Sequence, residues 1–238
     1  MISVVLPCYN PLDDWCRTVL DHMSELNRLL TGYTVQYIIS NDGSTRLNLR
    51  EIDIVTAFPH VTFLNNQVNE GKGSAIRKGM KHAEGNIIIY TDIDFPFGTS
   101  PIVEMVKIFE KNPQIGFVYG SRNVAYFKKL PFKRQLVSKG LHLLNRLFLA
   151  DHVIDTQAGI KGLRREILPE VLDTKTNTFV FEIELIHKLV RKKIGIGSVE
   201  VSANPAIVFS DFSIKVLFRE AVSLARIMMI SGIWNNFS

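Results

Sequence analysis

The segment Asn86-Ile87-Ile88-Ile89-Tyr90-Thr91-Asp92-Ile93-Asp94 is an apolar run that ends in two carboxylates. A continuous run of this kind is typical of a strand covered on both faces, as in a parallel sheet. Alternation along an extended strand would place Asp92 and Asp94 on the same side. Because open α/β sheets bind ligands outside the carboxyl ends of their strands, we expect both carboxylates to face a ligand crevice.

Two converging carboxylates suit a hard cation, so Asp92 and Asp94 are candidate ligands for Mg²⁺ or Mn²⁺, with a diphosphate completing the coordination. The alternative is a strand end with two solvated acids, since a lone Asp-x-Asp is common. The six histidines form no H-E-x-x-H pattern and there is no C-x-x-C, so no zinc site is predicted.

Short apolar runs alternate with helical patterns through the first 120 residues. This alternation predicts an α/β fold with a mostly parallel sheet, right-handed crossovers and helices on both faces. The other predicted strands of this half are 3–7, 35–40, 61–64 and 116–120, and its predicted helices are 14–30, 74–83 and 101–110.

The second half has fewer apolar runs. It predicts helices over 136–149, 181–192 and 213–233 and a strand over 196–201. The last helix is amphipathic, and it can lie in a membrane interface, on the core or on another subunit. We expect a domain over 1–210, with a nucleotide-binding half (1–122) and an acceptor half (123–210), followed by an amphipathic helix over 211–238.

Composition favours a folded, non-secreted protein. Of 238 residues, 46% are hydrophobic and 21% are charged, which is enough apolar material for a buried core. The net charge of +5 is compatible with anionic substrates, anionic lipid or nucleic acid. The two cysteines form no disulfide framework, so a reducing compartment is expected. No secretory signal is recognised. No run reaches 18 apolar residues, so no membrane-spanning helix is expected.

Three polar segments are further candidates. In segment 41–45, Asp42 could accept hydrogen bonds from a nucleoside. In segment 69–74, Lys72 and exposed backbone N–H groups could contact a phosphate or ribose. Segment 155–161 could form the acceptor side of a pocket. Each segment can equally be an ordinary turn or glycine-rich loop, and Glu182 can be a helix cap.

Taken in order, these segments resemble family 2 glycosyltransferases with the GT-A fold, the nucleotide-diphospho-sugar transferase fold. The matching motifs are V-V-L-P-C-Y-N (4–10), N-D-G-S-T (41–45, usually D-D-G-S-T), N-x-G-K-G-x-A-x-R-x-G (69–79), D-x-D (92–94) and V-x-G-S-R (118–122).

Two motifs of the second half are similar to those of polyprenyl-phosphate (dolichyl-phosphate) glucosyl- and mannosyltransferases. They are D-T-Q-x-G-x-K (155–161) and F-x-F-D-x-E-L (179–185), in which Glu182 replaces the usual Asp. The resemblance implies inverting transfer of a hexose from a UDP-glucose-type or GDP-mannose-type donor to a dolichyl or undecaprenyl phosphate. Pro11 replaces the family's usual Glu, and Phe95-Pro96 lacks the Gln of some mannosyl members.

The resemblance also implies roles for individual residues. The expected catalytic residues are Asp94, Arg122, Gln157 and Lys161, and the expected metal ligands are Asp92 and Asp94. Basic segment 128–139 would face a lipid phosphate. The expected substrate-binding residues are Pro7, Tyr9, Asn10, Asp42, Lys72, Arg77, Asp92, Arg134 and Glu182.

Alternative functions follow from the same residues. Transfer to a saccharide hydroxyl would require a carboxylate base, and the usual E-D pair and Q-x-x-R-W motif are missing. A sugar nucleotidyltransferase would carry G-x-G-x-R-x-x-P-x-T, which is absent, and a non-catalytic nucleotide-sugar-binding module is a further alternative.

The protein is expected to be cytoplasmic and peripheral at the inner face of a membrane. It is expected to bind no nucleic acid and is a possible homo-oligomer.

Overall fold

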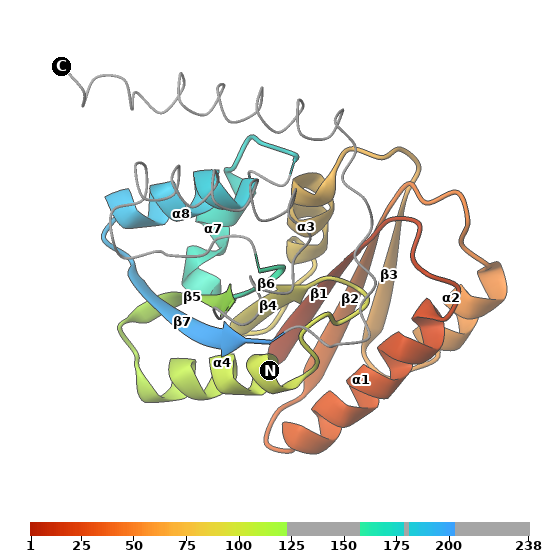
Figure 1. Cartoon of the computed structure of the whole chain (residues 1–238), viewed down its shortest axis with the longest axis horizontal. Helices are drawn as coiled ribbons and strands as arrows, with labels where there is room; N and C mark the ends of the chain where they lie inside the picture. Colours follow the sequence, from red (N-terminus) through yellow and green to blue (C-terminus); the bar gives the residue numbers. More distant parts are fainter. Residues whose placement is uncertain (123–157, 179–180, 203–238) are drawn as a thin grey trace.

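The computed structural model describes residues 1–122, 158–178 and 181–202. Within these ranges the chain forms a seven-stranded sheet with the order β3-β2-β1-β4-β6-β5-β7 (Figure 1). Only β6 is antiparallel to its neighbours, β4 and β5. The strands are β1 (Ile2–Cys8), β2 (Val35–Asp42), β3 (Val61–Asn66), β4 (Ile87–Thr91), β5 (Ile115–Arg122), β6 (Ile160–Arg164) and β7 (Gly195–Val201).

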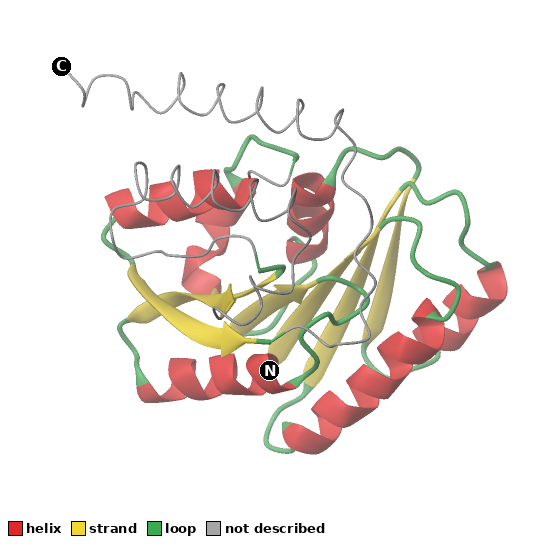
Figure 2. Cartoon of the chain, viewed as in Figure 1, coloured by secondary structure: helices red, strands yellow, loops and turns green. Residues whose placement is uncertain are grey.

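Helices cover both faces of this sheet (Figures 1 and 2). One face carries α1 (Trp15–Leu29), α2 (Leu49–Thr56) and α4 (Ser100–Lys111). The other carries α3 (Lys72–Met80), α7 (Leu168–Leu172), which follows a short 3₁₀ helix, and α8 (Phe181–Arg191). The neighbours Val4 and Val5 of β1 are both fully buried, but they belong to the hydrophobic clusters on opposite faces. Burial on both faces explains why the central strands β1 and β4 are largely apolar runs.

The predicted α/β architecture with a mostly parallel sheet is confirmed. All six predicted strands are present, as are the predicted helices of the described ranges, with ends that differ by a few residues. The sequence did not predict α2, α7 or β6. Segment 155–161 was predicted to be either the acceptor side of a pocket or a turn. From Ile160 onward it is strand β6 inside the sheet, so the turn does not extend to Lys161.

Several predictions fall outside the described residues: the helix over 136–149, the basic segment 128–139 and the amphipathic helix over 213–233. The domain boundaries therefore stay predictions, although β6 and β7 join the strands of the first half in one sheet. None of the helices placed by the structure is long and apolar enough to cross a membrane.

Candidate active site

The strand order reverses between β1 and β4. After β1 the chain adds β2 and β3 on one side, then returns to place β4 on the other. Pairing of β1 with β4 stops at Val5 and Tyr90, whereas pairing with β2 continues to Cys8. Pro7, which has no N–H to donate, lies in the part of β1 that β4 does not pair with. Such a switch point is where open α/β sheets bind ligands, and Asp92 directly follows β4.

Asp92 and Asp94 lie in a tight turn after β4, here called the acidic turn (92–95). The Phe95 N–H donates to the Asp92 carbonyl oxygen at 2.9 Å. The expectation of an extended strand through Asp94 is therefore wrong, because β4 ends at Thr91. Asp94 is exposed as a residue, yet its carboxyl interacts with Asp92: partial desolvation and then the charge of Asp92 raise its pKa.

Lys72, the first residue of α3, contacts the acidic turn. Its Nζ lies 2.6 Å from Asp92 Oδ1, and the two side chains are 15% and 37% exposed. Burial alone would lower the pKa of Lys72. The charges of Asp92, Glu182 and Asp94 outweigh that effect, so the ammonium has a raised pKa and stays protonated.

A second lysine, Lys161, is fully buried within the sheet. It lies opposite Tyr90 in the β4–β6 register, and its Nζ donates to the Glu182 carboxylate and to the Ala158 carbonyl oxygen. The Tyr90 hydroxyl donates to the Glu182 carboxylate at 3.1 Å. The observed contacts of Lys161 and Glu182 therefore tie β4, β6 and α8 together. A direct contact of either side chain with substrate stays a prediction.

Gly159 brings the segment before β6 against the acidic turn. The Ala158 carbonyl oxygen accepts hydrogen bonds from the Ile160 N–H, at 2.8 Å, and from Lys161. A Cβ atom on Gly159 would lie 2.1 Å from Asp92 Oδ2. Only glycine allows this segment to approach the Asp92 carboxylate so closely.

Gly159→Ala is expected to displace the Asp92 carboxylate and to weaken Mn²⁺ binding in the presence of UDP by about 10–100-fold. Calorimetric titration of Mn²⁺ into the protein, with UDP or GDP added, measures this affinity. The matched control is Gly32→Ala, because an added Cβ there meets no atom within 4 Å. Equal Mn²⁺ affinity in the two variants would show that Gly159 does not help to place Asp92.

Asp42 joins the loop after β2 to the start of α3. Its carboxylate accepts the N–H groups of Glu70, at 3.0 Å, and Gly71, at 2.8 Å, and the residue is 3% exposed. The Gly73 N–H donates to the Asn177 carbonyl oxygen at 2.8 Å. The N–H groups of Glu70, Gly71 and Gly73 therefore bond within the protein. Contact of this loop with a phosphate or ribose, through Lys72, stays a prediction.

Asp42→Ala is expected to lower the free energy of unfolding by about 1–3 kcal/mol, because two part-buried N–H groups lose a charged acceptor. Urea unfolding measures this change, and Asp42→Asn, which retains one acceptor oxygen, should lose less. If Asp42 instead serves only the nucleoside, the Ala variant will unfold like the wild type while its affinity for UDP falls.

Arg77 and Asn10 also bond to neighbouring segments of the chain. The Arg77 guanidinium donates to Thr174 Oγ1, at 3.1 Å, and to the Thr176 carbonyl oxygen, at 2.8 Å. Asn10 Oδ1 accepts the Thr45 N–H at 2.9 Å. Both side chains thus stabilise loops near the carboxyl edge of the sheet, and their contact with substrate stays a prediction.

Two other predicted site residues lie near solvent. Tyr9 is 54% exposed, and the partly exposed Arg122 ends β5. Strands β4 and β5 both pair antiparallel with β6, so they run in the same direction and their carboxyl ends lie at the same edge of the sheet. The backbones of Asp92 and Arg122 at that edge are separated by two strand spacings, or about 10 Å. Gln157 and Arg134 lie outside the described residues.

Two further residues at the acidic turn were not predicted from the sequence. Gly159 belongs to the D-T-Q-x-G-x-K motif, so that motif's glycine was an available signal. The His22 ring stacks on the Phe95 ring with centroids 4.6 Å apart. His22 lies within an ordinary amphipathic helix, and no local pattern distinguishes it.

The donor atoms of the acidic turn fit Mg²⁺ or Mn²⁺. Desolvation and the charge of Asp92 raise the pKa of Asp94, and a divalent cation would offset both effects. In the ranges that the structure covers, no group of three or more His, Cys, Asp or Glu side chains could hold a metal ion. This arrangement resembles that of Mg²⁺ sites in which one or two carboxylates share the ion with substrate phosphates.

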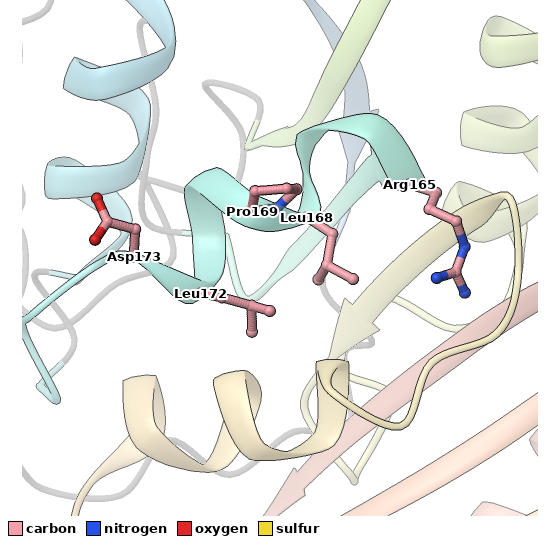
Figure 3. Close-up of a pocket in the computed structure, with 5 residues that line it drawn as sticks. All are labelled: Arg165, Leu168, Pro169, Leu172 and Asp173. Carbon is pink, nitrogen blue, oxygen red and sulfur yellow. The ribbon is translucent and has the colours of Figure 1, made fainter.

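A cavity of about 600 Å³ lies at α7 and the 3₁₀ helix before it (Figure 3). None of its lining residues belongs to the acidic turn. The Arg165 guanidinium, at one end of this cavity, donates to the Ala83 and Gly85 carbonyl oxygens. Its charge therefore serves the fold, and the cavity is not part of the candidate active site. The lining residues are Arg165, Leu168, Pro169, Leu172 and Asp173.

Residues 3–172 match the family described as "Glycosyl transferase family 2". Two Trichomonas vaginalis proteins named dolichyl-phosphate beta-glucosyltransferase are 25% identical over 240 residues (95% of this chain, 72% of the relative) and 30% identical over 176 residues (69% and 53%). A Saccharomyces cerevisiae protein of that name is 24% identical over 224 residues (84% and 66%). The chain thus spans about half to three quarters of the length of these relatives.

Among solved structures, the chain resembles glucosyl-3-phosphoglycerate synthase from Mycobacterium tuberculosis. A crystal structure of that enzyme with Mn²⁺, UDP and glucosyl-3-phosphoglycerate has a TM-score of 0.68 at 19% identity, covering 95% of this chain and 79% of the enzyme. Another, with Mg²⁺ and UDP, has a TM-score of 0.65 at 17% identity, covering 95% and 79%. At these identities the likeness shows a shared fold.

Proposed function

Because the chain belongs to glycosyl transferase family 2, we propose that it is an inverting glycosyltransferase that moves a hexose from a nucleoside diphosphate sugar to a polyprenyl phosphate. The observation that carries the choice of acceptor is the alignment of 95% of the chain with a dolichyl-phosphate beta-glucosyltransferase. A dolichol-phosphate mannosyltransferase from Pyrococcus furiosus aligns over 81% of the chain at 24% identity. The donor is therefore of the UDP-glucose or GDP-mannose type.

The acidic turn is the proposed donor site. A divalent cation held there by Asp92 and Asp94 would neutralise the diphosphate as it leaves the sugar. Lys72 adds a protonated ammonium beside Asp92, where charge develops on the leaving group. Lys72 and Gly159 together restrict the position of the Asp92 carboxylate before any ligand binds.

The acceptor determines whether a general base is needed. A phosphate monoester has a second pKa of about 6, so it is already anionic at neutral pH and can attack without losing a proton. Glu182, the third carboxylate that interacts with Lys72, is paired with Lys161, and we propose no role for it as a base. The acceptor instead requires cations, and Arg122 lies at the correct edge to supply one. The basic segment 128–139, with Arg134, is proposed to supply others.

A lipid acceptor also implies contact with a membrane surface. We propose that the amphipathic helix over 213–233 lies in the lipid interface, so that the protein is peripheral at the cytoplasmic face. Residues 1–122 would bind the nucleotide, and 123–210 the acceptor. A homo-oligomer is compatible with this arrangement.

The proposed function is tested with the full chain, Mn²⁺ and either UDP-[¹⁴C]glucose or GDP-[¹⁴C]mannose. Dolichyl phosphate, undecaprenyl phosphate and no acceptor are compared. Label is expected to enter an organic-extractable product that mild acid hydrolyses, only when a polyprenyl phosphate is present. Label in a water-soluble saccharide would support the hydroxyl-acceptor alternative. UDP binding without transfer to any acceptor would support a non-catalytic module.

A further inference from the structure

One face of α1 contacts the chain between β4 and α4 at two points. The His22 ring stacks on the Phe95 ring, with centroids 4.6 Å apart and planes 5° apart. Thr99 Oγ1 donates to Glu25 Oε2 at 2.8 Å. His22 and Glu25 are three residues apart and so lie on the same helix face. The segment that follows the two aspartates is therefore attached to α1 at both of its ends.

Phe95 has an unusual backbone conformation. Its φ of 46° lies in the left-handed region, which bulky residues rarely adopt. The residue is 2% exposed, its N–H donates to the Asp92 carbonyl oxygen, and its own carbonyl oxygen accepts the Gly98 N–H at 2.8 Å. Because strain of this kind persists only where the surroundings fix it, the packing around Phe95 determines how the chain leaves Asp94.

The orientation of the His22 ring is itself fixed. Its Nδ1 lies 2.7 Å from the Thr18 carbonyl oxygen, one turn earlier in α1. A carbonyl oxygen can only accept, so Nδ1 carries the hydrogen. His22 also lies within electrostatic reach of Asp94: burial and Asp92 raise the pKa of that carboxyl, while Lys72 and His22 act to lower it.

We propose that His22 is a positioning residue for Asp94. By stacking on Phe95, it holds the left-handed residue that follows Asp94 and keeps that carboxylate beside Asp92 for a divalent cation. His22 acts through Phe95 and does not itself bind the cation or the sugar. The inference rests on the proposed metal role of Asp94, but it is independent of the proposed acceptor.

The test compares His22→Ala, which removes the ring, with His22→Phe, which retains a flat ring. His82→Ala, at an exposed histidine, is the control. Amide hydrogen exchange over 92–99 without ligand and Mn²⁺ affinity with UDP, followed by electron paramagnetic resonance, are the two readouts. His22→Ala is expected to exchange faster over 92–99 and to bind Mn²⁺ about 10–100-fold more weakly, whereas His22→Phe stays near the wild type.

Wild-type exchange or wild-type Mn²⁺ affinity in His22→Ala would overturn the proposal, as would a His22→Phe variant that is equally impaired. His22→Leu, which retains apolar bulk without the flat ring, replaces the Ala variant if that variant does not fold. Neither readout uses an acceptor, so failure of the lipid-transfer assay leaves both results interpretable. A wild type that binds no Mn²⁺ with UDP or GDP would overturn this inference and the metal proposal together.

Discussion

Asp94→Asn is expected to lower sugar transfer by about 10²–10³-fold without lowering the stability of the fold. The substitution keeps the shape of the side chain but removes a charge that would help to hold the cation at the leaving diphosphate. Stability should not fall, because burial and Asp92 raise the pKa of Asp94. The ionised carboxylate is thus less favourable in the folded protein than in the unfolded chain at neutral pH.

Initial rates at saturating donor and Mn²⁺, together with thermal unfolding of the same preparations, check this result. Asp53→Asn, at an exposed position on α2, is the matched control and should behave like the wild type in both measurements. A wild-type rate in Asp94→Asn would contradict the proposed role. A loss of activity that matches a loss of folded protein would indicate a structural role instead.

Lys161→Met is expected to lower the free energy of unfolding by about 3–5 kcal/mol, because it leaves a buried carboxylate without its partner. The Lys161 side chain is 0% exposed and that of Glu182 is 7% exposed. The Glu182 carboxylate also accepts the Tyr90 hydroxyl, so the loss affects strand β4 directly. Guanidinium unfolding measures the change, and Lys81→Met, at an exposed lysine, is the control.

The double variant Lys161→Met with Glu182→Gln removes both charges and keeps an acceptor for the Tyr90 hydroxyl. It should therefore recover most of the lost stability. Its Mn²⁺ affinity should stay below that of the wild type, because the Ala158 carbonyl oxygen still lacks the lysine that helps to fix the Gly159 segment. A single Lys161→Met variant as stable as Lys81→Met would contradict the buried ion pair.

The central strand β4 was predicted from a local pattern. Segment 86–91 is apolar on both sides because helices cover both faces of the sheet, and this leaves a continuous pattern in the sequence. Strand β6 has no such pattern, since its five residues include Lys161 and Gly162. The partner that neutralises Lys161 is Glu182, which lies in a helix 21 residues later, so only the tertiary structure reveals why a lysine is buried there.

The contacts within the candidate site also depend on tertiary structure that the sequence does not reveal. The sequence predicted that Asp92 and Asp94 would lie together, but through an extended strand, whereas a hydrogen-bonded turn brings them together. The motif 69–79 marked Lys72 as important, but only the structure pairs it with Asp92. The stacking of His22 on Phe95 joins residues from separate elements, and no spacing along the chain encodes it.

Mn²⁺ binding followed by electron paramagnetic resonance, with and without UDP or GDP, tests most directly whether Asp92 and Asp94 hold a divalent cation together with a nucleoside diphosphate. The wild type should bind a single Mn²⁺ ion far more tightly when the matching nucleotide is present. A variant that combines Asp92→Asn with Asp94→Asn should leave Mn²⁺ in solution while remaining folded. Equally tight, nucleotide-dependent Mn²⁺ binding by that folded variant would contradict the account.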